Sequence, residues 1–282
     1  MRHAIATALL VLATAVPATA GEVVSRQQGG VTMVGDLALA PGKTLKDGVV
    51  LMLHGSLQHR DQELLAALEE RLTERGFNTL SVTLSLSVDR REGPFDCAQP
   101  HRHRHQDAVA ELAGWVDHLK GQGAGPITLL GHSRGGNQVA RYLAAGGDPA
   151  VAKAVLVAPA TGLDPAQSAE LLKLADGKAD DAMVDVPRFL TCPAGKATAG
   201  SIRSYHADDG GFSTPALLPK VKPPVLVLAA SDDTVVPDLP KLMAGVNQPN
   251  VTFRTIDQSD HFFRDFAADD TADAVAAFVG AP

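Results

Sequence analysis

Short, unbroken runs of apolar residues recur along this chain, and stretches with apolar residues at helical spacing separate them. A run of strand length without alternation is typical of a parallel strand buried on both faces. Unbroken runs predict strands at Val49–Leu53 and Val225–Ala229. We also interpret Phe77–Leu84, Ile127–Leu130, Ala152–Val157 and Val251–Ile256 as strands, although polar residues interrupt them. An alternating segment, Val31–Leu39, predicts one more strand, which ends at the turn residues Pro41 and Gly42.

Apolar residues at every third or fourth position predict the helices. In Asp61–Arg75 this stripe consists of leucines, and Gly76 follows the predicted end. The other predicted helices are His105–Lys120, Arg134–Ala145, Leu239–Val246 and Phe266–Val279. Strands that alternate with helices form a mostly parallel sheet with helices on both faces. Right-handed crossovers then give a doubly wound α/β fold.

Two stretches interrupt this alternation. Residues 85–104 are polar and carry Cys97. Residues 161–219 are longer, contain several Pro and Gly, and hold only short helical pieces. Because this second stretch lies between two predicted strands, we interpret it as a small cap inserted into a single domain that spans residues 21–282.

The first 20 residues have a different pattern. A short basic start, Arg2 and His3, precedes the apolar run Ala4–Val16, and Ala18-Thr19-Ala20 follows as a cleavage site before Gly21. This pattern predicts a secretory signal peptide over residues 1–20. The run is shorter than the roughly 20 apolar residues that span a bilayer. We therefore expect a cleaved, exported protein, periplasmic or secreted, without stable membrane insertion.

Composition and charge indicate which classes of binding partner to expect. The chain has 282 residues and a net charge of −7, so nothing predicts the basic surface that nucleic acid requires. The pattern carries no information on the oligomeric state. The two cysteines, Cys97 and Cys192, would reach an oxidising compartment, and their even number predicts one disulfide. Two buried free thiols are the alternative.

The candidate chemistry begins at Gly131-His132-Ser133-Arg134-Gly135, between a predicted strand and a predicted helix. This G-x-S-x-G pattern places a serine on a sharp turn, where its hydroxyl projects above the sheet. Glycines two positions before and after remove the Cβ atoms that would clash where strand and helix meet. The backbone N–H of Arg134 lies at the helix N-terminus, where it can stabilise a developing oxyanion.

With this motif the chain resembles the α/β-hydrolase superfamily, and two further segments extend the resemblance. His54-Gly55 follows the strand Val49–Leu53, where these proteins carry His-Gly. The resemblance implies that the backbone N–H of Ser56 is the second oxyanion donor, with Leu57 as the positional alternative. After Val225–Ala229, the superfamily pattern Asp-x-x-Val-Pro selects Asp233 over Asp232 as the acid of a catalytic triad.

The base implied by the resemblance is His261, which precedes two phenylalanines and the last predicted helix. The chain order Ser133, Asp233, His261 is the order that this fold uses. The resemblance implies an exported serine hydrolase that cleaves small-molecule carboxylic esters or thioesters through an acyl-enzyme, without metal or organic cofactor. A peptidase or lipase of the same superfamily, or a non-catalytic binding protein with this fold, are the alternatives. The substrate-binding residues are not predicted.

A second cluster, His101, His103 and His105, occupies alternate positions. Its imidazoles would share one face of an extended segment and could then bind zinc or copper. No cysteine or carboxylate cluster accompanies them, so we interpret the segment as a solvated loop that enters the next helix. A third interpretation is that His101, His103 or an adjacent arginine contacts an acidic group of the substrate.

Overall fold

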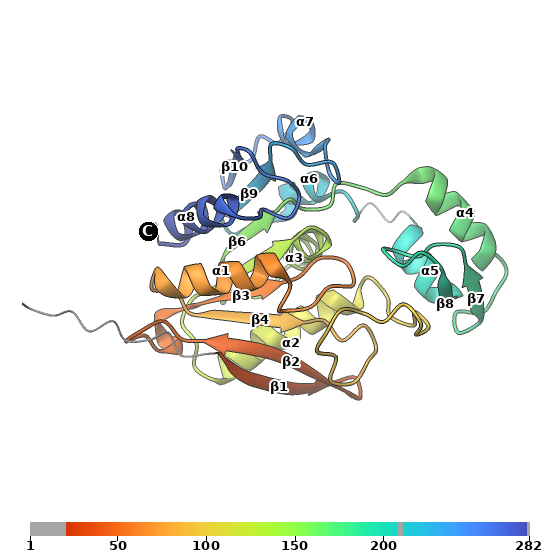
Figure 1. Cartoon of the computed structure of the whole chain (residues 1–282), viewed down its shortest axis with the longest axis horizontal. Coiled ribbons are helices and arrows are strands. Elements are labelled where there is room, and N and C mark those ends of the chain that lie inside the picture. Colours follow the sequence, from red (N-terminus) through yellow and green to blue (C-terminus); the bar gives the residue numbers. More distant parts are fainter. Residues whose placement is uncertain (1–20, 208–210, 281–282) are drawn as a thin grey trace, which may run out of the picture.

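The computed structural model describes residues 21–207 and 211–280, so the predicted signal peptide, residues 1–20, lies outside the described residues. An eight-stranded sheet with the order β1-β2-β4-β3-β5-β6-β9-β10 forms its centre (Figure 1). The strands are β1 (Glu22–Gln28), β2 (Val31–Ala38), β3 (Val49–Leu53), β4 (Thr79–Thr83), β5 (Ile127–His132), β6 (Val151–Val157), β9 (Val225–Ala230) and β10 (Val251–Ile256). Strand β2 pairs antiparallel with β1 and β4, and every other neighbouring pair is parallel.

Helices cover both faces of this sheet. Helix α1 (Glu63–Glu74) packs against α8 (Phe266–Gly280), and α2 (Asp107–Gly121) packs against α3 (Arg134–Ala144) (Figure 1). A short helix, α7 (Leu239–Met243), follows β9. The predicted doubly wound α/β fold is confirmed, and each predicted strand and helix of the sheet domain is present within a few residues of its expected bounds.

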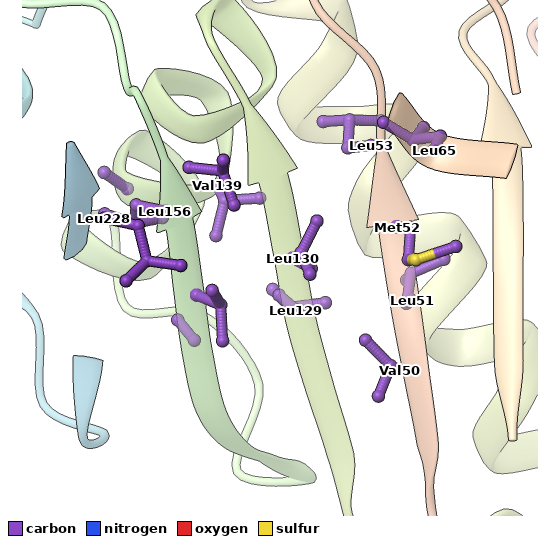
Figure 2. Packing of buried hydrophobic residues seen from close by; sticks show 14 of the residues in the cluster. Val50, Leu51, Met52, Leu53, Leu65, Leu129, Leu130, Val139, Leu156 and Leu228 are labelled. Carbon is purple, nitrogen blue, oxygen red and sulfur yellow. The ribbon is translucent and has the colours of Figure 1, made fainter. Parts of the chain in front are cut away.

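The core lies on both sides of the central strands. Every residue of β3, β5 and β9 is buried, and β3 and β9 accordingly consist of apolar residues alone. Figure 2 shows side chains of adjacent strands packed together, among them Leu51, Leu129 and Leu156, with Val139 from α3 beside them. Strand β1 was not predicted, because its side chains are mostly exposed at the sheet edge and follow no apolar pattern.

The insertion between β6 and β9 begins with a small unit that we call the cap: α4 (Pro165–Ala175), the hairpin of β7 (Met183–Val186) and β8 (Gly195–Thr198), and α5 (Ala199–His206). The cap extends away from the sheet (Figure 1) and encloses its own apolar cluster, in which Leu171, Phe189 and Tyr205 take part. The last part of the insertion, α6 (Thr214–Leu217) and the short 3-10 helix Leu218–Lys220, packs on α3 instead.

Residues 85–104 lie beside the cap and are joined to it. Cys97 and Cys192 form the predicted disulfide, with their Cα atoms 5.6 Å apart. His101 pairs with Ala197 of β8: its N–H donates to the carbonyl of Lys196 (2.8 Å), and its carbonyl accepts from the N–H of Thr198 (2.9 Å). The segment therefore adds a short extended stretch to the cap hairpin.

The interpretation of the three histidines as a solvated loop is wrong, because His101, His103 and His105 are each 0% exposed. The alternation that we noted places the rings inward on an extended segment, under the cap. The ring of His101 stacks on Phe95, and the ring of His105 stacks on Phe212. Within residues 21–207 and 211–280, no cluster of three His, Cys, Asp or Glu is arranged to hold a metal ion. No helix of this same part of the chain is long and apolar enough to cross a membrane.

Candidate active site

Ser133 occupies the sharp turn between β5 and α3, with φ 54° and ψ −120°. This region is strained for any residue with a Cβ, and such strain is concentrated at functional sites. The flanking glycines allow the turn to close. A Cβ on Gly131 would lie 2.5 Å from the carbonyl oxygen of Gly135, and a Cβ on Gly135 would overlap the carbonyl oxygen of His54. The strand, the turn and the helix therefore meet only because these positions carry no side chain.

Three residues from distant parts of the chain form a hydrogen-bonded series at this turn. The Nε2 atom of His261 lies 3.0 Å from the hydroxyl oxygen of Ser133. The Nδ1 atom of the same ring lies 2.8 Å from Oδ2 of Asp233. Asp233 and His261 are buried, and Ser133 is partly exposed. The structure thus brings together the three residues that the sequence marks as nucleophile, base and acid.

Asp233 and Asp232 differ in position. Asp232 is exposed, whereas Asp233 is buried and accepts backbone hydrogen bonds at Oδ1 from Val235 (2.7 Å) and Val236 (2.9 Å). Burial raises the pKa of Asp233, but the hydrogen bonds from His261 and from these N–H groups outweigh it and leave the pKa below its ordinary value. Asp233 is therefore a carboxylate fixed in orientation, with its second oxygen on the imidazole.

The loop after β3 passes beside the serine. A Cβ on Gly55 would lie 3.3 Å from the Cβ of Ser133. Ser56 lines the same pocket as Ser133 and Arg134. Leu57, the positional alternative, is buried and does not line this pocket; it lines a much smaller cavity that Ser56 and Arg134 line as well. Arg134 is the first residue of α3, so its N–H has no partner within the helix. The N–H groups of Ser56 and Arg134 are thus the candidate oxyanion donors.

His54 fixes the peptide that carries the first of these donors. Its Nδ1–H donates to the carbonyl of Gly55 (2.7 Å), and its Nε2 accepts from the N–H of Leu84 (3.0 Å). Burial lowers the pKa of His54 well below its usual value, so the ring is neutral. Because the C=O and N–H of a trans peptide point in opposite directions, a carbonyl held by His54 directs the N–H of Ser56 the other way.

His132 has a role that sequence reasoning missed. Its Nε2–H donates to the backbone carbonyl of His261 at 2.9 Å, and its ring lies 5.0 Å from the His261 ring, centroid to centroid. Burial lowers the pKa of His132 to about 4. The residue before the serine therefore contacts the loop that carries the base. Its position in the motif is visible in the sequence, but no pattern shows where its side chain points.

Comparison with known proteins agrees with this geometry. The sequence model of the alpha/beta hydrolase family matches residues 50–278, which include all three residues of the hydrogen-bonded series. The chain belongs to the alpha/beta hydrolase family. A search of curated proteins gives no significant match.

Solved structures of other alpha/beta hydrolases share the fold at low sequence identity. Est1E from Butyrivibrio proteoclasticus superposes with a TM-score of 0.67 at 18% identity, covering 92% of this chain and 97% of that one. A monoacylglycerol lipase from Paleococcus ferrophilus gives a TM-score of 0.64 at 16% identity, covering 87% and 97%. An esterase from Pyrococcus furiosus gives 0.61 at 16% identity, covering 92% and 91%.

In this alpha/beta hydrolase, a pocket of about 420 Å³ opens at Ser133. Its walls come from the loop after β3, the start of the insertion, the cap and the loop after β9; they include Ser56, Arg134, Thr161, Asp164, Leu190, Thr191, His206, Val236 and Asp238. A second pocket of about 300 Å³ shares His206 with the first and is lined by Phe212. The aromatic rings of the insertion divide into two groups. Phe189 and Tyr205 belong to the apolar cluster of the cap, while His206 and Phe212 line the second pocket.

Proposed function

We propose that this protein is an exported serine hydrolase that cleaves carboxylic esters or thioesters through an acyl-enzyme on Ser133. The observation that carries the proposal is the unbroken hydrogen-bonded series from Ser133 through His261 to Asp233. A serine is activated for attack on a carbonyl when its hydroxyl is hydrogen-bonded to an imidazole that a buried carboxylate orients.

The groups divide the reaction between them. His261 accepts the Ser133 proton through Nε2 as the hydroxyl oxygen forms a bond to the carbonyl carbon. Asp233 holds the ring in the tautomer with the proton on Nδ1 and stabilises the imidazolium that forms. The N–H groups of Ser56 and Arg134 stabilise the negative oxygen of the tetrahedral intermediate. The imidazolium then gives its proton to the leaving alcohol or thiol.

The second half of the reaction uses the same residues. Water enters the site, His261 accepts one of its protons, and the resulting hydroxide attacks the acyl carbon. Collapse of the second tetrahedral intermediate returns the proton to Ser133 and releases the carboxylic acid. Both steps balance with this chain's own side chains and water, and the names of the structural neighbours, which include esterases and a lipase, agree with this reaction class.

A fluorophosphonate probe tests the nucleophile. We expect it to label the purified protein and Ser133→Ala to abolish labelling, while Ser25→Ala, on the exposed edge strand β1, leaves labelling unchanged. Labelling that survives in Ser133→Ala refutes the nucleophile assignment. Absence of labelling and of ester hydrolysis in the unmodified protein would favour a binding protein with this fold.

Export is a separate part of the proposal and rests on the sequence pattern of residues 1–20. Expression of the full chain followed by cell fractionation and intact mass measurement tests it. We expect a mature chain that begins at Gly21 outside the cytoplasm. A full-length chain retained in the cytoplasm contradicts export and leaves the proposed chemistry untouched.

A further inference from the structure

We propose that Arg134 makes this hydrolase selective for esters that carry a carboxylate a few bonds from the scissile carbonyl. The inference rests on the proposed function and names its substrate class. Its basis is the side chain of Arg134, whose backbone alone entered the mechanism above.

The guanidinium of Arg134 lies beside the loop that carries one of the candidate oxyanion donors. Arg134 follows the nucleophile directly, and its Nε–H donates to the hydroxyl oxygen of Ser56 at 2.9 Å. Ser56, Ser133 and Arg134 line one pocket. An ester whose carbonyl oxygen lies between the two candidate oxyanion donors therefore has its next few atoms within reach of this guanidinium.

The positive charge of Arg134 is not matched by a carboxylate among the residues that the structure describes. Within residues 21–207 and 211–280, no carboxylate lies within ion-pair distance of it, whereas Arg60 pairs with Asp36 and Arg203 with Asp180. The two Nη atoms of Arg134 have no hydrogen-bond acceptor in the same part of the chain, yet they are not among its fully buried polar atoms without a partner. They therefore keep some exposure, and Arg134 is one of the residues that line the pocket at Ser133.

The surroundings hold the guanidinium in place without neutralising it. Its carbon lies 5.7 Å from the centroid of the Tyr205 ring, which is buried in the cap. Burial lowers the pKa of Arg134 below its ordinary value, because desolvation disfavours the charged form. A bound carboxylate relieves this cost, because guanidinium and carboxylate form paired, charge-assisted hydrogen bonds.

The other titratable groups of the pocket do not compete for this role. His206 is neutral near pH 7, since burial lowers its pKa to about 4. Asp164 accepts backbone hydrogen bonds as the N-cap of α4, and Asp238 accepts from the hydroxyl of Thr161. Among the described residues that line the pocket, Arg134 is the only Lys or Arg. The described part of the pocket thus offers one permanent cation, and its two carboxylates already accept hydrogen bonds.

Matched ester pairs test the selectivity in a pH-stat. Monomethyl glutarate and methyl valerate have the same acyl length and differ in an acyl-side carboxylate. Carboxymethyl butyrate and propyl butyrate place the carboxylate on the alcohol side instead. We expect the kcat/KM ratio, acidic over neutral, to exceed one in at least one pair and to fall about tenfold or more in Arg134→Gln, the range of a lost charged hydrogen bond. Arg134→Lys should retain part of the ratio.

The control Arg254→Gln removes the same charge from the exposed strand β10 and should leave both ratios unchanged. Because each ratio uses a neutral ester as reference, it is insensitive to any general loss of activity through the Ser56 contact. Ratios that do not change in Arg134→Gln, in a protein that hydrolyses the esters, overturn the inference.

Equilibrium binding separates this inference from the proposed function. In Ser133→Ala, monomethyl glutarate should bind more tightly than methyl valerate, and Ser133→Ala with Arg134→Gln should lose the difference. Binding that depends on Arg134 in a protein that neither labels nor hydrolyses supports the selectivity while refuting catalysis. Equal binding of the two esters overturns the selectivity, whatever the outcome of labelling.

Discussion

The Nε2–H of His132 donates to the backbone carbonyl of His261 at 2.9 Å, so the residue before the nucleophile holds the loop that carries the base. Burial lowers the pKa of His132 to about 4, so near pH 7 the ring is neutral and, with its proton on Nε2, can accept a hydrogen bond at Nδ1. The Nδ1 atom faces the side-chain amide of Gln62 at 3.4 Å. The residue that precedes Ser133 thus helps to set the distance between Ser133 and His261.

His132→Leu removes this bond and keeps a side chain of similar bulk. We expect kcat on a neutral ester to fall about tenfold to a hundredfold with little change in KM, because a small misplacement of the base affects the transition state more than ground-state binding. Steady-state kinetics measure the split. An unchanged kcat, in a variant with the unfolding midpoint of the parent, would show that His132 is only part of the core.

Asp233→Asn and Asp232→Asn form a matched pair of adjacent substitutions. We expect Asp233→Asn to lower kcat by about 10³–10⁴-fold, since an amide favours the wrong imidazole tautomer. Asp232→Asn should change kcat less than about threefold, because this side chain is exposed and outside the hydrogen-bonded series. Kinetics on one nitrophenyl ester suffice, and equal losses in both variants would contradict the assignment of the acid.

The backbone strain at Ser133 predicts that a glycine at this position gives a more stable, inactive protein than an alanine does. At φ 54° and ψ −120° glycine is relaxed and alanine is not, so Ser133→Gly should unfold at higher urea than Ser133→Ala. We expect a difference of about 1–2 kcal/mol, and both variants lose the same hydroxyl. If the alanine variant is as stable as the glycine variant, the turn is not strained.

The disulfide predicts how firmly the cap is held. Cys97 and Cys192 are 95 residues apart in sequence, and loss of a native bridge typically lowers the free energy of unfolding by about 2–5 kcal/mol. We expect Cys97→Ser with Cys192→Ser to show this loss in urea unfolding and a weaker kcat/KM, because Thr191, beside the bridge, lines the pocket. Alkylation before and after reduction, read by intact mass, tests the bridge itself: free thiols in the unreduced protein would contradict it.

Buried histidines predict acid sensitivity. Burial lowers the pKa of His103 to about 3, from an unfolded value near 6.5. As the pH falls below about 6.5 the unfolded chain binds a proton that the folded chain does not, so the free energy of unfolding decreases by about 1.4 kcal/mol per pH unit for this group. His103→Gln removes this contribution, so its stability should fall less steeply from pH 6.5 to pH 4.5 in urea titrations. Parallel slopes for both proteins would mean that His103 is not buried in solution.

The sequence predicted the sheet domain well because the central strands are buried on both faces and the helices on one. Burial on both faces favours runs of apolar residues, and burial on one face of a helix favours an apolar stripe. The site followed from residues at strand ends, where Ser133, Asp233 and His261 had recognisable neighbours. Strand β1 escaped prediction because an exposed edge places few demands on its side chains.

The cap region was harder to predict for a different reason. The alternation of His101, His103 and His105 was visible, but whether an inward face exists depends on β8 and α5, nearly 100 residues further along the chain. The side chains of His132 and Arg134 pose the same problem. Their roles arise from contacts with His261 and Ser56, which only the folded chain brings close.

The joint between the cap and residues 85–104 bears on how a substrate arrives. A covalent bridge, the backbone pairing of His101 and a bond from the Ser201 hydroxyl to the carbonyl of His103 (2.7 Å) all join the two segments. An active-site lid opens and closes by moving relative to the segments beside it. Because the cap is joined to residues 85–104, we expect the aperture over Ser133 to keep a constant width during turnover. Esters too bulky for this aperture are then excluded by size, and solvent viscosity should affect the hydrolysis of the larger accepted esters no more than that of small ones.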